Sequence, residues 1–182
     1  MSVSRPQLLH RLRQHTPYDA TERGHLAATL AFVERHTDFY QRSNAAGQIT
    51  ASAWVVNAAR DKVLLIHHRK LRRWLQPGGH LEATDTSVAA AALREVREET
   101  GLAGRVVGHG LYDVDVHPIP AYGPVAAHRH YDLRVLVEVD EGAATRLDEQ
   151  EGTDLRWFAP NDLEALRPEA SVWRLWEKLA LR

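Results

Sequence analysis

Three carboxylates near the middle of the chain, Glu95, Glu98 and Glu99, have the spacing of one helix face. Side chains at i, i+3 and i+4 are neighbours on a helix, so their negative charges repel one another. The helix dipole adds to this repulsion near a helix C-terminus. A hard divalent cation would offset both effects, because Mg²⁺ binds carboxylate oxygens and keeps water and phosphate oxygens as its other ligands. By itself the pattern fits a metal site that also takes phosphate oxygens and a solvated charged helix face equally well.

The helix that positions these carboxylates is expected over residues 87–100. This stretch contains no Pro or Gly, and its alanine run is strongly helix-forming. Gly101 is a natural stop. At about 100° per residue, an apolar stripe forms beside the carboxylates. Its members are Ala89, Ala92, Leu93 and Val96.

The string around this helix resembles the Nudix box, G-x5-E-x7-R-E-U-x-E-E-x-G-U, in which U is aliphatic. Its second half matches without a gap, at Arg94, Glu95, Val96, Glu98, Glu99, Gly101 and Leu102. The first half holds one extra residue after the glycine turn Gly78–Gly79. Counting forward from Gly79 places Asp85 at the first box glutamate, and counting back from Arg94 places Thr86 there. Asp85 is the preferred stand-in, and Thr86 is the alternative.

The resemblance implies hydrolysis of a diphosphate linked to another moiety, with Mg²⁺ or Mn²⁺ as the cofactor. Carried over by position, the metal ligands would be Glu95, Glu98, Glu99 and the backbone carbonyl of Gly79, or of Gly78. Arg94 would hold the glutamates in place through charge-assisted hydrogen bonds. The catalytic residues would then be Arg94, Glu98 and Glu99, with the general base left unassigned.

The substrate is left open within one chemical class, nucleotide-type diphosphates. Nucleoside triphosphates, nucleoside diphosphate sugars such as ADP-ribose, and dinucleoside polyphosphates all fit the same box. Two alternatives are a non-catalytic Nudix-like domain that binds a nucleotide and regulates, and a prenyl diphosphate isomerase. The retained helix carboxylates argue against the first. The absence of cysteine argues against the second, since that family uses one for proton transfer.

Composition narrows the class of protein further. The chain has 182 residues, enough for one domain with a substantial core. A net charge of −1 gives no global reason to expect nucleic acid or an acidic membrane as partner. Without cysteine, disulfides, thiolate zinc sites and thiol catalysis are excluded. The first residues lack the apolar core of a signal peptide, and no stretch approaches the roughly 18 apolar residues of a membrane span. We therefore expect a soluble cytoplasmic protein.

Short β-branched runs on both sides of the central helix predict an α/β fold. The expected strands are residues 49–57, 62–68, 105–117, 131–139 and 155–158. Asn161 is predicted to cap a short helix, and a last helix presents Val172, Leu175, Trp176 and Leu179. This order suggests a mixed sheet between helical layers. The resemblance implies a Nudix-type α/β/α sandwich over roughly Ile49–Leu166.

An N-terminal helical extension is predicted from Arg5 to Asn44. Asp19 and Glu22 have capping-box spacing, and an apolar stripe follows, made of Leu26, Leu30, Val33 and Tyr40. We expect residues 1–48 to pack on a main hydrolase domain of residues 49–182, which includes the C-terminal helix. Core cover is the preferred role of the extension, while a lid or a dimer arm in a homodimer stays open.

A basic turn, residues 67–74, directly precedes the glycine turn. Arg69, Arg72 and Arg73 are predicted to bind substrate, because guanidinium forks match phosphate oxygens. A solvated hairpin end is the alternative.

Two polar trios alternate along consecutive strands, so each lies on one strand face. The trios are Asp113, Asp115 and His117, then His128, His130 and Asp132. A hairpin across residues 118–127 is expected to place His117 near His128, Asp115 near His130, and Asp113 near Asp132. One interpretation is an exposed, solvated hairpin. The other is a substrate-side strip in which His128 and His130 bind substrate or hold an additional ion.

Overall fold

The computed structural model describes residues 3–121, 123 and 125–181, so Tyr122 and Pro124 of the expected hairpin connection lie outside the described residues. The helices are α1 (Arg5–Gln14), α2 (Ala20–Arg35), α3 (Val88–Thr100), α4 (Pro160–Ala165) and α5 (Ala170–Ala180). The strands are β1 (Gln48–Val56), β2 (Val63–His68), β3 (Arg73–Leu75), β4 (Gly78–His80), β5 (Gly104–Val106), β6 (Asp113–Ile119), β7 (His128–Val139) and β8 (Gly152–Phe158).

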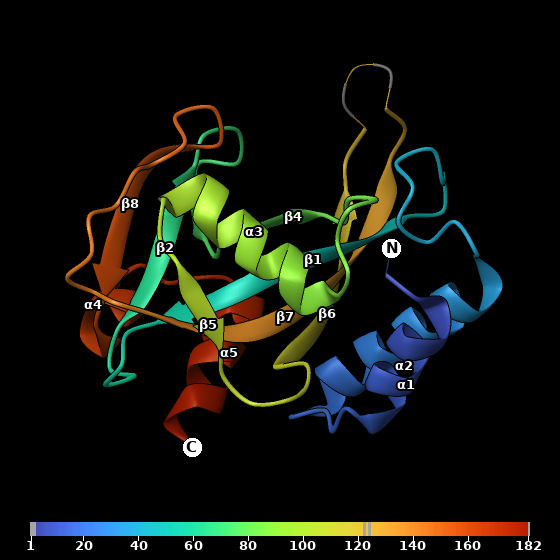
Figure 1. Cartoon of the computed structure of the whole chain (residues 1–182), viewed down its shortest axis with the longest axis horizontal. Coiled ribbons are helices and arrows are strands. Elements are labelled where there is room, and N and C mark those ends of the chain that lie inside the picture. The colour runs from blue at the N-terminus through green and yellow to red at the C-terminus, as the bar shows by residue number, and fades with distance from the viewer. Residues whose placement is uncertain (1–2, 122, 124, 182) are drawn as a thin grey trace. The chain divides into compact units, whose positions relative to one another are not determined.

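Hydrogen bonding joins these strands into one eight-stranded sheet in the order β3–β2–β1–β7–β5. In addition, β4 pairs with β1, β6 with β7, and β8 with β2 (Figure 1). The chain divides into two compact units, described separately below. Unit 1 comprises residues 1–51, 79–91 and 109–135, and unit 2 comprises residues 52–78, 92–108 and 136–182.

The N-terminal extension consists of two helices rather than one continuous helical stretch. α1 ends at Gln14, and Pro17 disfavours helical backbone at the residue before it. α2 is capped as predicted, because the Asp19 carboxylate accepts a hydrogen bond from the Glu22 N–H at 2.6 Å; such a cap contributes about 1 kcal/mol. α2 ends at Arg35, so Tyr40 lies outside the helix that was expected to carry it.

Glu22 has a different role from the one its capping-box spacing predicts. Its side chain is completely buried, and its carboxylate accepts hydrogen bonds from the backbone of Tyr18 at 2.6 Å and of Val114 at 3.0 Å. His15 Nε2 lies 2.7 Å from the same carboxylate. Because Val114 belongs to β6, Glu22 anchors α2 to that strand within unit 1.

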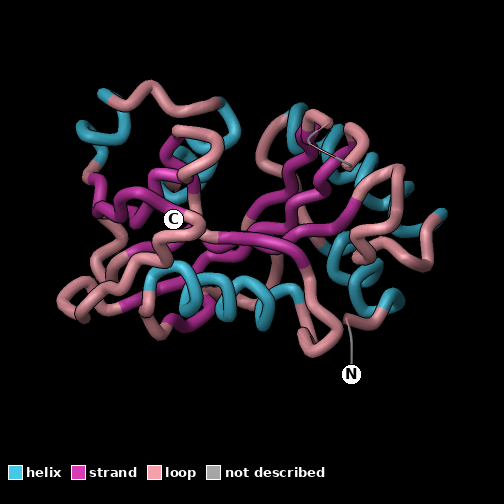
Figure 2. The backbone as a smooth tube through the Cα atoms, turned by 90° about the horizontal axis from the view of Figure 1, so that it is seen from above, coloured by secondary structure: helices cyan, strands magenta, loops and turns pink. Residues whose placement is uncertain are grey.

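β6 and β7 form the expected antiparallel hairpin. Figure 2 shows the strands in magenta and the helices in cyan. The predicted pairing was wrong by two residues: His117 faces His130, Asp115 faces Asp132, and Asp113 faces Arg134. A slip of two residues keeps every side chain on its predicted strand face, because side chains alternate with period two.

The strand expected over residues 105–117 is two strands. β5 covers only Gly104–Val106, and β6 begins at Asp113. Between them Gly108 has a φ of +84°, a conformation that interrupts an extended strand. Gly104 itself is required for close packing, since a Cβ there would lie 2.4 Å from Val137 Cγ1.

In unit 2, β2 is the central strand, with β1, β3 and β8 as antiparallel neighbours. Its first four residues are buried, which agrees with the apolar run that predicted it. The expected strands 49–57, 62–68 and 155–158 are thus confirmed as β1, β2 and β8.

The central helix is confirmed as α3. It ends where Gly101, with a φ of +75°, donates its N–H to the Arg97 carbonyl at 3.0 Å. Its buried stripe differs from the predicted one, because Ala92 and Val96 are buried while Ala89 and Leu93 are only partly covered. Residues 78–79, expected as a turn, belong to the short strand β4.

The C-terminal helices follow the predicted order. Ala159, and not Asn161, occupies the N-cap position of α4, and its N–H donates to the Asp162 carboxylate at 3.3 Å. Pro160 takes the first helical position, where its missing N–H costs nothing. In α5, Val172, Leu175 and Leu179 are buried as expected, and Trp176 is partly exposed. Of the helices in the described part of the chain, none combines the length and apolar character needed to span a bilayer.

Candidate active site

The C-terminal turns of α3 carry a connected set of charged side chains in unit 2. Arg94 Nη1 lies 2.8 Å from Glu95 Oε1 and 2.8 Å from Glu98 Oε2. Glu95 is buried, whereas the Glu98 side chain is 54% exposed. A single guanidinium therefore fixes two carboxylates, one facing the interior and one facing solvent. The contacts suit the holding role expected of Arg94, which stays a prediction.

Glu99 is the carboxylate whose charge is least compensated. Burial raises the pKa of the Glu99 carboxyl to about 8, and the neighbouring Glu95 charge adds to the shift. A hydrogen bond from the Gly78 backbone acts in the opposite direction, and Glu151 and Asp148 raise the pKa further. Around Glu99 the chain therefore brings more negative charge than it neutralises.

The loop before α3 is supported by Asp85 within unit 1. Asp85 is 5% exposed, and its Oδ2 accepts a hydrogen bond from the Glu82 N–H at 2.7 Å. The Asp85 N–H donates in turn to the Glu82 carbonyl at 3.1 Å. Thr86 is exposed. These contacts favour Asp85 over Thr86 as the stand-in for the first box glutamate.

Two of the three arginines of the basic turn, Arg69 and Arg73, already have hydrogen-bond or ion-pair partners within the chain. Arg69 donates to the carbonyls of Glu149 at 2.7 Å and Gly152 at 3.3 Å, and Arg73 pairs with Glu169. Arg72 is exposed and has a φ of +53°. The predicted phosphate role of the three arginines stays a prediction, and all three lie at the surface.

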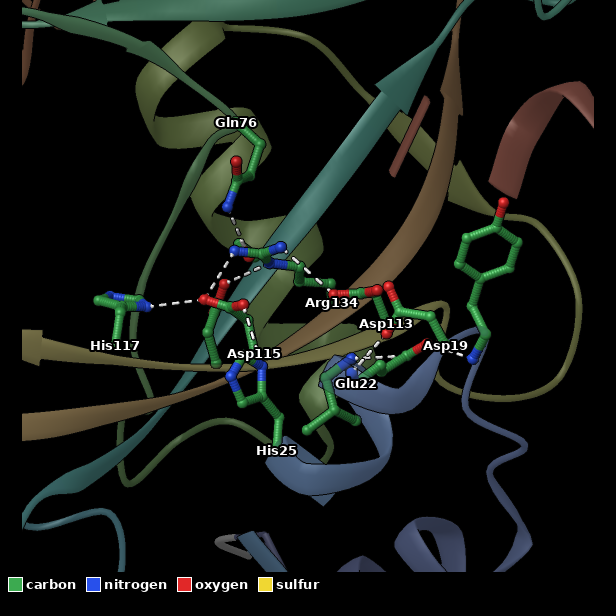
Figure 3. Close-up of polar contacts among 12 residues, drawn as sticks. Asp19, Glu22, His25, Gln76, Asp113, Asp115, His117 and Arg134 are labelled. Atoms are coloured by element: carbon green, nitrogen blue, oxygen red, sulfur yellow. Dashed lines mark hydrogen bonds and ion pairs between the residues drawn. The ribbon is translucent and has the colours of Figure 1, made fainter. Parts of the chain in front are cut away.

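Three aspartates of the hairpin surround one buried arginine, Arg134, in unit 1 (Figure 3). Its Nε lies 2.8 Å from Asp132 Oδ2, its Nη1 3.3 Å from Asp113 Oδ1, and its Nη2 3.4 Å from Asp115 Oδ2. Burial alone would lower the pKa of Arg134, but the three carboxylates raise it above its ordinary value. For these aspartates the solvated-hairpin interpretation is wrong, because all three are buried.

The Asp–Arg134 cluster, defined as Arg134, Asp113, Asp115 and Asp132, is extended by neighbouring side chains. Thr50 donates to Asp132 at 3.0 Å, and His117 Nδ1 lies 3.1 Å from Asp115 Oδ2. His25 of α2 lies 3.2 Å from Asp115, within ion-pair distance although not in hydrogen-bond geometry (Figure 3). Arg134 continues the alternation His128, His130, Asp132 by one further step. This alternation is the sequence pattern that could have predicted Arg134 as a member of the group, and the prediction missed it.

Four imidazoles form a second group in unit 1, here called the histidine cluster: His80, His117, His128 and His130. The His130 ring centroid lies 5.0 Å from that of His80, 5.2 Å from that of His128 and 5.7 Å from that of His117. Burial lowers the pKa of His130 to about 3, with His80, His117 and His128 adding to the shift. Burial, Arg42 and His128 lower the pKa of His80 to about 4.

Across residues 3–121, 123 and 125–181, no group of three or more His, Cys, Asp or Glu side chains is arranged as it stands to hold a metal ion. The α3 carboxylates nevertheless suit a hard divalent ion in donor type, since they are oxygen ligands. Burial and the neighbouring carboxylates raise the pKa of Glu99, and a bound cation would act in the opposite direction.

A family model described as NUDIX domain matches residues 47–176. The chain belongs to the NUDIX domain family. The match spans the α3 carboxylates, Arg94 and the loop with Asp85, and so confirms the resemblance found in the sequence. This protein is a Nudix-type pyrophosphohydrolase, and hydrolases of this family generally need a divalent metal.

Solved structures agree with this family. A NUDIX-family hydrolase from Clostridium perfringens is 25% identical, with a TM-score of 0.55 over 73% of this chain and 96% of that one. An Ap4A hydrolase from C. elegans is 17% identical, with a TM-score of 0.58 over 73% and 95%. A UDP-X diphosphatase, also 17% identical, has a TM-score of 0.53 over 96% and 91%. No curated protein matches the chain.

These similarities confirm the predicted fold class, an α/β/α sandwich with a mixed sheet. The UDP-X diphosphatase also covers most of the residues before position 47, so a Nudix fold with a comparable N-terminal region exists in a solved structure. The division into residues 1–48 and 49–182 stays a prediction.

Proposed function

We propose that this Nudix hydrolase cleaves a pyrophosphate bond in a nucleoside diphosphate linked to another moiety, with Mg²⁺ or Mn²⁺ as the cofactor. The observation that carries the proposal is the set of carboxylates at the end of α3. Arg94 contacts Glu95 and Glu98, and Glu99 lies in a region short of positive charge. Such a set suits the combined binding of a divalent ion and phosphate oxygens.

The metal would be held by Glu95, Glu98 and Glu99, with the Gly79 carbonyl as a further oxygen donor. When bound, it would neutralise phosphate charge and polarise the attacked phosphorus. Arg94 orients the Glu95 and Glu98 carboxylates, because its guanidinium contacts both. The Gly78 backbone orients Glu99 through a hydrogen bond. When ionised, Glu98 and Glu99 are the carboxylates that would accept a proton.

The proposed substrate class is a nucleotide with an internal diphosphate. Two of the structural neighbours bear names of this chemistry, an Ap4A hydrolase and a UDP-X diphosphatase. Their identity to this chain is 17%, so they support the class of substrate by analogy and not a particular nucleotide.

A nucleotide panel tests the proposal directly. Nucleoside triphosphates, nucleoside diphosphate sugars and dinucleoside polyphosphates are incubated with the full chain and Mg²⁺, and released nucleotides are resolved by chromatography. We expect cleavage within the diphosphate of at least one class, and no cleavage with EDTA. Binding of a nucleotide without turnover, under Mg²⁺ and Mn²⁺ alike, would instead identify a regulatory nucleotide-binding domain.

We also propose that His128 and His130 contribute to substrate binding, as their place on the hairpin face predicts. The double variant His128→Ala with His130→Ala should raise KM for the best substrate roughly tenfold, about 1.4 kcal/mol of binding. The matched control is His10→Ala with His109→Ala, which removes two exposed histidines elsewhere. An unchanged KM in the first variant would remove both residues from the substrate site. Arg72→Ala tests the basic turn in the same assay.

A further inference from the structure

The two central imidazoles of the histidine cluster face each other through the same ring atom. His128 Nε2 lies 3.3 Å from His130 Nε2. In a tetrahedral site with metal–nitrogen bonds of about 2.0–2.1 Å, two ligand nitrogens are separated by roughly 3.3–3.4 Å. The pair is therefore already spaced as two ligands of one ion.

The other ring nitrogens show which atoms carry protons. His128 Nδ1 lies 2.9 Å from the Ala126 carbonyl oxygen, which only accepts, so Nδ1 carries the hydrogen and Nε2 of the neutral ring has a free lone pair. Metal-binding histidines typically donate their second N–H to a carbonyl or a carboxylate in this way. His117 Nδ1 faces Asp115 Oδ2 at 3.1 Å, a contact that this ring must give up in order to turn toward the other two.

His130 lies between these two rings. Without an ion, its Nε2–H can donate to His128 Nε2, an ordinary hydrogen bond between neutral imidazoles. With an ion, its proton would be on Nδ1.

We propose that His128 and His130, with His117 as the third ligand, bind a borderline divalent ion of the Zn²⁺, Ni²⁺ or Cu²⁺ class. Imidazole nitrogen suits these ions, whereas Mg²⁺ prefers oxygen ligands. The three rings do not yet converge on one point among the described residues. The His117 side chain is 41% exposed, so it has space to change rotamer and complete the site. This site is separate in chemistry from the α3 carboxylates, and it is an alternative to the direct substrate contacts proposed above for His128 and His130. Zn²⁺ binding is measured without substrate, so failure of one proposal is distinguishable from failure of the other.

The test uses the full chain, freed of metal with EDTA and then held in excess Mg²⁺ so that the oxygen-rich sites are occupied. Zn²⁺ is titrated in by calorimetry, and Cu²⁺-loaded protein is examined by electron paramagnetic resonance. We expect one Zn²⁺ per chain and nitrogen hyperfine lines on the copper signal. His128→Ala, and His128→Ala with His130→Ala, should each weaken Zn²⁺ binding at least ~10-fold.

The control variant His10→Ala with His109→Ala should bind Zn²⁺ like the unaltered chain. Circular dichroism and Tm show whether each variant is folded, and the single His128→Ala change, at a partly exposed position, decides the question if the double variant does not fold. The proposal is overturned if no Zn²⁺ binds in excess Mg²⁺, if His128→Ala binds it with unchanged affinity, or if the control variant loses binding equally.

Discussion

The end of α3 and the β6–β7 hairpin each gather three carboxylates, but they differ in the source of the balancing charge. On the hairpin, Arg134 contacts Asp113, Asp115 and Asp132 and is itself 2% exposed. On α3, Arg94 contacts Glu95 and Glu98, one of which is largely exposed. The first set is thus enclosed around its own cation, while the second keeps one exposed carboxylate, Glu98.

This difference distinguishes a structural charge cluster from the site at which we propose that a cation binds. Three desolvated aspartates are tolerated only with the Arg134 guanidinium among them, since buried charges need partners. At Glu99, burial and the nearby carboxylates raise the pKa, which a bound cation would lower. Two groups that look alike in sequence therefore have different expected responses to mutation, pH and metal.

Replacing Arg134 should have the largest effect, which is on the free energy of unfolding. Arg134→Met leaves three buried carboxylates without their partner, and we expect the free energy of unfolding to fall by about 3–5 kcal/mol at neutral pH. The measurement is chemical denaturation followed by circular dichroism. Arg105→Met is the matched control, because Arg105 pairs with Glu138 while 67% exposed, and its loss should cost about 1 kcal/mol or less. Equal, small losses in both variants would show that the Asp–Arg134 cluster is not structural.

Neutralising the α3 carboxylates should affect turnover instead of folding. Glu98→Gln and Glu99→Gln should each lower kcat at least ~100-fold, about 2.7 kcal/mol of activation free energy, with Tm essentially retained. The assay is steady-state hydrolysis of the best substrate over a range of Mg²⁺ concentrations. Glu164→Gln, an exposed carboxylate on α4, serves as control. Near-normal turnover in both variants contradicts the metal assignment.

The pH dependence of the metal-free protein sharpens the comparison. The pKa of Glu99 is about 8 in the folded protein, and its ordinary value, expected in the unfolded chain, is 4.5. Between pH 4.5 and pH 8 the folded state therefore holds a proton that the unfolded state has lost. Stability from this group therefore decreases as pH rises from about 4.5 to 8. Glu99→Gln should flatten the fall of Tm over this range, and Mg²⁺ should raise the Tm of the unaltered chain more than that of the variant. Identical Tm profiles would contradict the prediction.

The smallest effects are expected at the loop before α3. Asp85 is a buried carboxylate that accepts a hydrogen bond from the Glu82 backbone N–H. Its partner is thus a backbone group, in contrast to the arginine partners of the hairpin aspartates and of Glu95 and Glu98. Asp85→Ala should lower the free energy of unfolding by about 1–2 kcal/mol, measured as a lower Tm, or lower kcat modestly. Thr86→Ala should have a smaller effect on both. A larger loss for Thr86→Ala would reverse the register chosen for the Nudix box.

Much of the fold could be predicted from local pattern. β1, β2, β8, α3 and the Asp19 cap appear as expected, because period, capping chemistry and glycine stops are properties of neighbouring residues. The errors have tertiary causes. The hairpin register, off by two residues, depends on pairing between strands, and the burial of Glu22 depends on a backbone N–H of Val114 almost a hundred positions away.

By itself, the sequence determined the family and the residues of the proposed metal site, because the Nudix box is a contiguous string whose spacing sets one helix face. Only the tertiary structure decided what the other polar residues do. Asp113, Asp115 and Asp132 proved to be enclosed around Arg134, and His128 proved to face His130. The sequence specifies the type and charge of each residue. Whether a carboxylate contacts an arginine, a metal or water depends on which strands pair and in which register.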